Sequence, residues 1–114
     1  MRITNRTRET LLASDAREAQ SFIARLVGLL SRSSLAPGEA LVLDPCTSVH
    51  TVCMRFSIDV LYVNRDGQVI KVVPEMGPFR ASAAGSMRCY VIELPSGTAA
   101  GTHTAVGDQL EIER

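Results

Sequence analysis

The chain has 114 residues, 46% of them apolar, which is enough for a single hydrophobic core, so we expect one domain over residues 1–114. Twelve basic and twelve acidic side chains cancel, which argues against a nucleic-acid partner. The sequence shows no secretory signal and no run near the roughly 18 apolar residues of a membrane-spanning helix. We therefore expect a soluble, cytoplasmic protein without a membrane partner. Three cysteines then fit reduced thiols better than a disulfide framework.

Residues 15–30 carry the helical pattern of the sequence. Asp15 followed three residues later by Glu18 is typical of a capping box, and Pro37 and Gly38 mark the end of the region. Apolar side chains recur on one side with helical spacing at Ala19, Phe22, Ile23, Leu26 and Leu30. The sequence predicts an amphipathic helix over residues 15–30.

The rest of the chain is predicted to form about eight short strands. Asp66–Gly67 is a hairpin turn signal, and the strand before it is apolar on both faces and should be central in its sheet. Two prolines and two glycines predict that residues 74–87 form an irregular loop, suited to be the wall of a site. The predicted strands cover residues 2–5, 10–13, 39–44, 48–54, 58–64, 68–74, 88–95 and the end of the chain after Gly107–Asp108. We expect a mainly β fold, a small sandwich or partly open barrel with one helix.

The stretch "PCTSVHTVCMRFSIDVLYV", residues 45–63, concentrates the reactive side chains. Cys46, His50 and Cys53 are zinc-ligand types, but in an extended chain His50 and Cys53 point to opposite faces and no fourth ligand is apparent. Cys46 and His50 would lie about 13 Å apart at about 3.3 Å per residue, too far for a nucleophile and its base without a turn. We expect no metal and no cofactor, and read both cysteines as small buried hydrophobes.

His50, Arg55 and Asp59 admit two interpretations. In the first, His50 is a core histidine, and Asp59 pairs with an arginine (Arg55 or Arg88) or caps N–H groups of a neighbouring loop. In the second, His50 carries a proton at a pocket, Asp59 orients it and Arg55 holds an anion. Glu93, within "VIELP", likewise has either a structural role or a role in a site.

The sequence resembles the bacterial and archaeal family known as domain of unknown function 192. The likeness rests on "RLVGLLSR", "LAPGEALVLDPC", "SVHTVCMRFSIDVLYVNRDGQVIKVV", "GPFR", "VIELPSG" and "VGDQLEI", which occur in the family's order over nearly the whole chain. The His-Thr-x-x-Met-Arg-Phe-x-Ile-Asp run is the specific part. The chain departs from the family pattern at Val52 and Cys53, where an aromatic residue or glycine is common, and at Ser57, where proline is common. The resemblance implies a jelly-roll-like sandwich with a helix packed outside, and it implies no reaction.

The leading functional hypothesis is a non-catalytic module that binds a small molecule or peptide, because no complete catalytic constellation is recognisable. Its predicted ligand-binding residues are His50, Thr51, Met54, Arg55, Asp59, Arg80 and Glu93. One alternative is a small hydrolase-like enzyme, with His50 and Asp59 as candidate catalytic residues and Arg55 beside them. Another is an accessory module that docks a protein partner through an exposed apolar patch.

Overall fold

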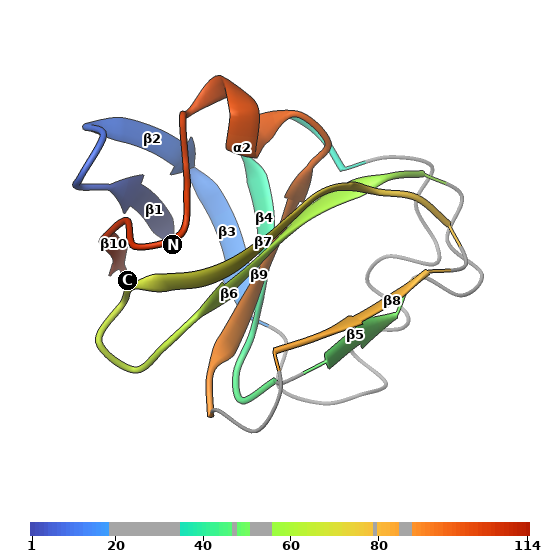
Figure 1. Cartoon of the computed structure of the whole chain (residues 1–114). Helices are drawn as coiled ribbons and strands as arrows, with labels where there is room; N and C mark the ends of the chain where they lie inside the picture. Colours follow the sequence, from blue (N-terminus) through green and yellow to red (C-terminus); the bar gives the residue numbers. More distant parts are fainter. Residues whose placement is uncertain (19–34, 47, 51–55, 79, 85–87) are drawn as a thin grey trace.

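The structure, a computed structural model, describes residues 1–18, 35–46, 48–50, 56–78, 80–84 and 88–114, and for His50 the backbone alone. Figure 1 follows the chain through its elements, whose numbering is kept here. In chain order these are β1 (Arg2–Asn5), β2 (Thr10–Ala13), β3 (Asp15–Glu18), β4 (Glu39–Leu43), β5 (Ser48–His50), β6 (Ile58–Val63), β7 (Val69–Met76), β8 (Ala81–Ala83), β9 (Tyr90–Pro95), α2 (Thr98–Gly101) and β10 (Leu110–Glu113).

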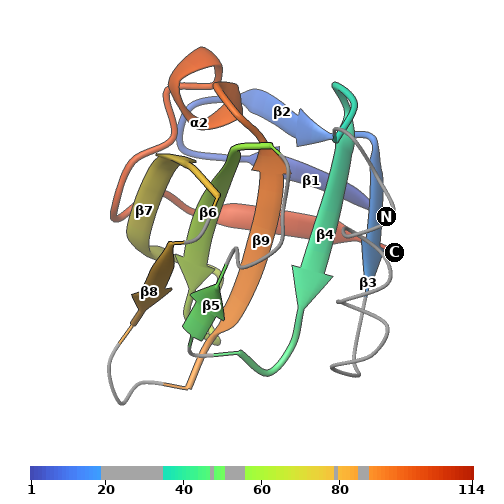
Figure 2. The ribbon, with the colours of Figure 1, turned by 90° about the vertical axis from the view of Figure 1, so that its right-hand side faces the viewer.

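The described strands form three sheets. The largest has the order β3-β4-β9-β6-β7, a second has the order β10-β1-β2, and β5 pairs with β8 in a two-stranded ribbon. Figures 1 and 2 show α2 at one end of the molecule and the β5–β8 ribbon at the other. The sheets have open ends and do not close into a barrel. The predicted mainly β fold is confirmed.

Strand β6 lies inside the five-stranded sheet, between β9 and β7, as its apolar faces predicted. All six of its residues are buried. Because side chains alternate along a strand, Leu61 and Val63 join the core shared with the three-stranded sheet, and Val60 joins a second core on the opposite face. The second core includes Val49 of the ribbon. The central sheet therefore separates two hydrophobic cores.

The turn between β6 and β7 is the predicted hairpin. Gly67 has φ +84°, a conformation that L side chains rarely adopt, and a Cβ there would lie 2.9 Å from the Leu110 carbonyl oxygen. The Asn64 side-chain oxygen accepts hydrogen bonds from the N–H groups of Asp66 (3.0 Å) and Gln68 (2.9 Å). Both backbone conformation and close packing thus require glycine at this turn.

The predicted start of the helix at Asp15 is wrong. Residues Asp15–Glu18 form β3, which pairs in parallel with β4 from Glu39 to Val42. The backbone N–H of Ala16 donates to the Met1 carbonyl (2.9 Å), and the Ala16 side chain is buried in the first core. These long-range contacts outweigh the local capping pattern, because tertiary packing overrides helix propensity. The rest of the predicted helix, from residue 19, lies outside the described residues.

The prediction that residues 74–87 form an irregular loop is also wrong in part. Strand β7 continues through Pro74 to Met76, and β8 covers Ala81–Ala83. Proline is tolerated because β7 is at the edge of its sheet, where one side of the strand needs no N–H donor. The register shifts here between Ile58 and Val60, and Glu75 has φ +50°.

Helix α2 is a single turn of four residues. Among the residues that the structure describes, no helix has the length and apolar character needed to cross a membrane. The radius of gyration is 12.6 Å, close to the roughly 13 Å of a compact chain of about 100 residues.

Candidate functional site

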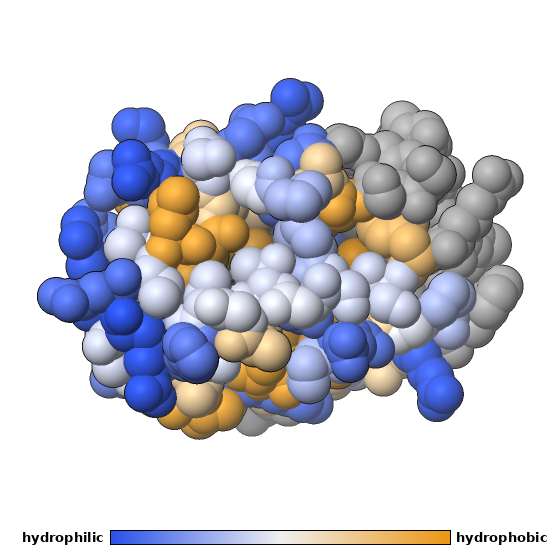
Figure 3. Space-filling view, turned by 90° about the horizontal axis from the view of Figure 1, so that it is seen from above, coloured by the Kyte–Doolittle hydropathy of each residue, from blue (hydrophilic) through white to orange (hydrophobic). Residues whose placement is uncertain are grey.

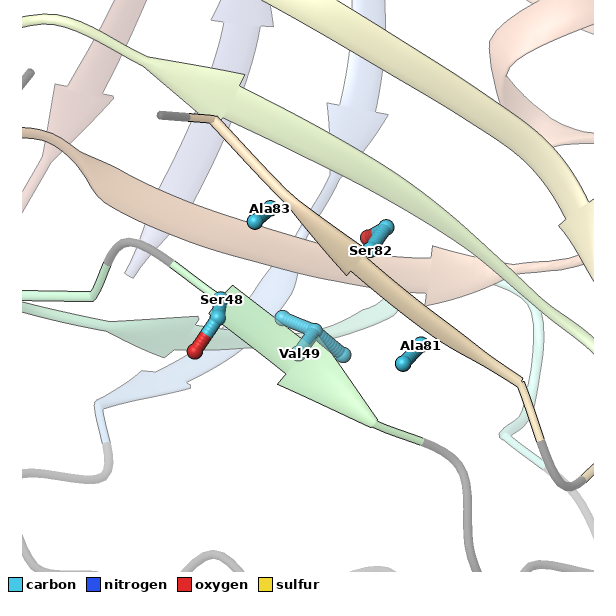
Figure 4. A pocket seen from close by; sticks show the side chains of 5 residues that line it. All are labelled: Ser48, Val49, Ala81, Ser82 and Ala83. Atoms are coloured by element: carbon cyan, nitrogen blue, oxygen red, sulfur yellow. The ribbon is translucent and has the colours of Figure 1, made fainter. Parts of the chain in front are cut away.

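An open pocket of about 500 Å³ lies on the β5–β8 ribbon, and we name it the ribbon pocket. Figure 4 shows the described side chains that line it, which come from these two strands: Ser48, Val49, Ala81, Ser82 and Ala83. Ser48, Ala81 and Ala83 are exposed, whereas Val49 is buried. The pocket lies between part of the reactive stretch and the segment after Pro74, and none of the predicted ligand-binding residues is among these five.

The ribbon is attached to the central sheet by polar contacts. Val49 and Ser82 are partners in the ribbon register, and the Ser82 hydroxyl lies 2.6 Å from the Tyr62 hydroxyl of β6. Burial raises the pKa of Tyr62, although the hydrogen bond with Ser82 acts in the opposite direction. The Lys71 ammonium donates to the Ala83 carbonyl (2.7 Å) and lies 5.7 Å from the centre of the Tyr62 ring. These contacts hold β8 on the central sheet, and β5 is held by its pairing with β8.

A neighbouring pocket of about 400 Å³ shares Ala81 with the ribbon pocket. It contains Arg80, which is exposed, and it is otherwise lined by residues of β7 and the segment after it: Val73, Pro74, Glu75, Met76 and Gly77. The structure therefore places the predicted ligand-binding residue Arg80 beside the ribbon pocket.

Four of the predicted site residues cannot be placed as side chains. His50 ends β5, where its backbone pairs with Ala81 across the ribbon. Its side chain, and Thr51, Met54 and Arg55 entirely, lie outside the described residues. Their roles in binding or catalysis stay predictions.

Asp59 has a structural role. Its residue is fully buried, and its carboxylate accepts three backbone hydrogen bonds. Oδ1 accepts from Glu75 N–H (2.8 Å), and Oδ2 accepts from the N–H groups of Gly97 (3.1 Å) and Ala99 (2.8 Å). The carboxylate thereby joins the irregular part of β7 to the beginning of α2, which matches the interpretation of Asp59 as a loop cap. Its predicted catalytic and ligand-binding role finds no support, because no part of Asp59 is exposed.

Glu93 is also buried, with 4% of its surface exposed. On β9 it pairs with Leu41 of β4 and Val60 of β6, in the interior of the central sheet. Burial is the main cause of the raised pKa of Tyr62, and Glu93 makes the smallest contribution to it, after Cys46 and Cys89. Glu93 therefore lies on the ribbon side of the sheet but below the surface.

Cys46 and Cys89 are neighbours, although 43 positions separate them in sequence. Cys46 N–H donates to the Cys89 carbonyl (2.9 Å), and the Cys89 thiol donates to the Cys46 carbonyl (2.9 Å). Both are free and buried, and burial, followed by the nearby Cys46, raises the pKa of Cys89. Within the described part of the chain, no three His, Cys, Asp or Glu side chains gather as metal ligands. The reading of Cys46 as a buried hydrophobe agrees with these contacts, and Cys53 lies outside the described residues.

A polar cluster near α2 was missed by sequence reasoning. The Asn5 side-chain amide is fully buried and donates to Thr104 Oγ1 (3.1 Å) and to Asp108 Oδ2 (3.0 Å). The same Asp108 oxygen accepts from Arg8 Nε (3.1 Å) and from Ala105 N–H (3.0 Å). The cluster joins residues about one hundred positions apart, so no local spacing could have revealed it.

Asp108 is charged in this cluster despite its burial. Burial alone acts to raise its pKa, but the hydrogen bonds from Asn5, Ala105 and Arg8 and the Arg8 charge together lower the pKa below that of an ordinary aspartate. A carboxylate held in this way fixes the position of the arginine bound to it.

Comparisons with known proteins agree with this fold. The UPF0127 protein PF1050 of Pyrococcus furiosus is 29% identical over 116 residues, which cover 96% of this chain and 97% of the relative. A crystal structure of a protein of unknown function from Novosphingobium aromaticivorans superposes with a TM-score of 0.79 at 19% identity, over 97% of this chain and 82% of that one. A Sinorhizobium meliloti protein provisionally described as a transcription regulator gives a TM-score of 0.80 at 21% identity, over 96% and 89%.

At these identities, the two solved structures establish the shared fold and no more. The family model of DUF192, described as "Uncharacterized ACR", matches residues 3–112. This match spans both cores, the ribbon and the polar cluster near α2. The chain is a member of the DUF192 family.

Proposed function

We propose that the protein is a small non-catalytic binding domain, and that its ligand occupies the ribbon pocket. The observation that carries the proposal is the pocket itself, an opening of about 500 Å³ formed by two short paired strands, of which β8 is bonded to the central sheet. Pockets of roughly 300–1,000 Å³ are typical of small-molecule sites.

The lining indicates what kind of ligand fits. Val49 and two alanines provide apolar contact, and the hydroxyls of Ser48 and Ser82 provide hydrogen bonds. None of these five residues is an acid, a base or a thiol, which favours binding over catalysis. The ligand is therefore a mainly apolar, uncharged group, such as a small molecule or the apolar side chain of a short peptide.

The experiment is an NMR titration of the ¹⁵N-labelled chain with a library of small uncharged molecules and short apolar peptides. Binding at the proposed site shifts the backbone amide signals of residues 48–49 and 81–83. Ala81→Arg places a long charged side chain in the pocket, and we expect it to weaken binding by about tenfold or more. Ser96→Arg is the matched control, because Ser96 is exposed and lies outside the ribbon pocket.

Two outcomes would overturn the proposal. One is a library without binders, and the other is a set of binders that shift only signals remote from the ribbon. The proposal is also overturned if the Ala81→Arg chain binds the ligand as tightly as the unchanged chain does.

A further inference from the structure

A second open pocket, of about 530 Å³, lies beside α2 at the opposite end of the molecule from the ribbon, and we name it the α2 pocket. Its lining residues come from the loop after β1, from β7 and from the region of α2: Arg8, Val72, Pro74, Ala99, Ala100, His103 and Thr104. Figure 3 shows the face that carries α2, where hydrophobic groups lie among paler and hydrophilic residues. The lining combines an apolar part with one permanent positive charge, that of Arg8.

Arg8 is held in position by the buried carboxylate of Asp108. Its Nε donates to Oδ2 of Asp108, which is 3% exposed and is held in turn by Asn5 and by the Ala105 N–H. Among the described residues, the two terminal nitrogens of Arg8 take part in no hydrogen bond or ion pair. The two terminal nitrogens of a guanidinium can bind both oxygens of a carboxylate at once.

His103 is fixed in position by the end of the helix. It has φ +57°, and its N–H donates to the Ala100 carbonyl (3.2 Å), while the next N–H, that of Thr104, donates to the Ala99 carbonyl (2.9 Å). This pair of bonds is a Schellman motif, in which glycine is the usual residue at the position that His103 occupies. Here that position places an imidazole, which offers a ring N–H donor, at the pocket.

Apart from Thr104, whose hydroxyl accepts from Asn5, the remaining described lining of the α2 pocket is apolar. Val72 and Pro74 contribute from β7, and Ala99 and Ala100 from α2. Inorganic anions gain nothing from such a surface, whereas an organic acid buries its hydrocarbon part there.

From these contacts we propose that the α2 pocket binds an organic carboxylate. Arg8 pairs with the carboxylate, His103 donates a further hydrogen bond to it, and the apolar part of the ligand lies on Val72, Pro74 and the two alanines. This site is separate from the ribbon pocket and does not rest on the function proposed for it.

The test compares three probes by NMR titration: sodium benzoate, benzamide and inorganic phosphate. Benzoate is expected to shift the amide signals of residues 99–104. Benzamide, which lacks the charge, and phosphate, which lacks the apolar ring, are expected to bind at least about tenfold more weakly. Benzamide or phosphate binding as tightly as benzoate, or benzoate shifting only other signals, overturns the proposal.

Two variants test the residues. Arg8→Gln should weaken benzoate binding by about tenfold, with Arg17→Gln, an exposed arginine outside the pocket, as control. Because Arg8 also pairs with buried Asp108, the spectrum of the Arg8→Gln chain must first show the unchanged fold. An unchanged benzoate affinity in folded Arg8→Gln overturns the proposal.

His103→Gly keeps the fold, since glycine is the preferred residue at this position, and should lower benzoate affinity several-fold without lowering Tm. Glu9→Gly is its matched control, because Glu9 has nearly the same φ of +56° and does not line the pocket. If His103→Gly binds benzoate as tightly as Glu9→Gly, His103 does not contact the carboxylate and the proposed site is wrong.

Discussion

Two buried aspartates differ in the partners that they hold. Asp59 is fully buried, and its three hydrogen-bond donors among the described residues are backbone N–H groups. Asp108 is 3% exposed, and two of its three donors are the side chains of Asn5 and Arg8, the second of which reaches the α2 pocket. Asp59 therefore fixes only the backbone among the described residues, whereas Asp108 also orients a side chain that the solvent can reach.

The largest effect is expected from Asp59→Ala. It leaves three backbone N–H groups without their acceptor, that of the buried Ala99 among them, and we expect a loss of about 3 kcal/mol in the free energy of unfolding. Asp59→Asn keeps one acceptor oxygen and should lose about half as much. Urea denaturation measures both, with exposed Asp66→Ala as control. A loss below about 1 kcal/mol for Asp59→Ala would contradict the structural role.

Asp108→Ala should cost less, about 2 kcal/mol. Asn5 still donates to Thr104, and the Arg8 side chain, 45% exposed, can bind water instead. The same urea titration provides the comparison. A larger loss for Asp108→Ala than for Asp59→Ala would reverse the proposed order of the two carboxylates.

Asp108 should make the free energy of unfolding depend on pH in the acid range. Its pKa is lowered in the folded chain, so the folded state binds this proton less tightly than the unfolded state does. The stabilisation is complete at neutral pH and is lost as the pH falls below the ordinary aspartate value of 3.8. In Asp108→Asn, the fall of the free energy of unfolding below about pH 4 should be less steep, by at most about 1.4 kcal/mol per pH unit. Parallel curves for the two chains would show that Asp108 does not carry this dependence.

The parts of the fold that sequence predicted are those encoded by local signals. The β6–β7 hairpin follows from a glycine that must take positive φ and from a strand that is apolar on both faces. The parallel pairing of β3 with β4 could not be predicted, because Asp15 and Glu18 also fit a helix start, and the contacts that decide the matter come from Met1 and Gly38. Strand β8 was missed because the two prolines and two glycines of residues 74–87 were taken to exclude a regular strand there.

For the candidate site, the sequence could point only to residues that are close together along the chain. The ribbon pocket adjoins the stretch that the sequence marked as reactive, but its described lining consists of small residues, and the predicted Arg80 lines the neighbouring pocket instead. Asp59 stood out because a carboxylate in an apolar strand needs donors, yet its donors are backbone groups that no sequence pattern identifies. The pairing of Asn5 with Asp108 depends wholly on the folded chain.

The smallest effect is expected from glycine at two positions with positive φ, one beside each aspartate. Glu75, with φ +50°, donates its N–H to Asp59, and His103, with φ +57°, follows α2 near the Asp108 cluster. Glycine removes the steric penalty of the Cβ in this region, about 1 kcal/mol, but loses more conformational entropy on folding, so a net gain of about 0.5 kcal/mol is expected for Glu75→Gly. The gain should be smaller for His103→Gly, because histidine adopts this conformation more readily than glutamate does. Urea midpoints at an unchanged m value measure both. If Glu75→Gly instead destabilises the chain, the Glu75 side chain contributes to stability and its backbone conformation is not the strained element beside Asp59.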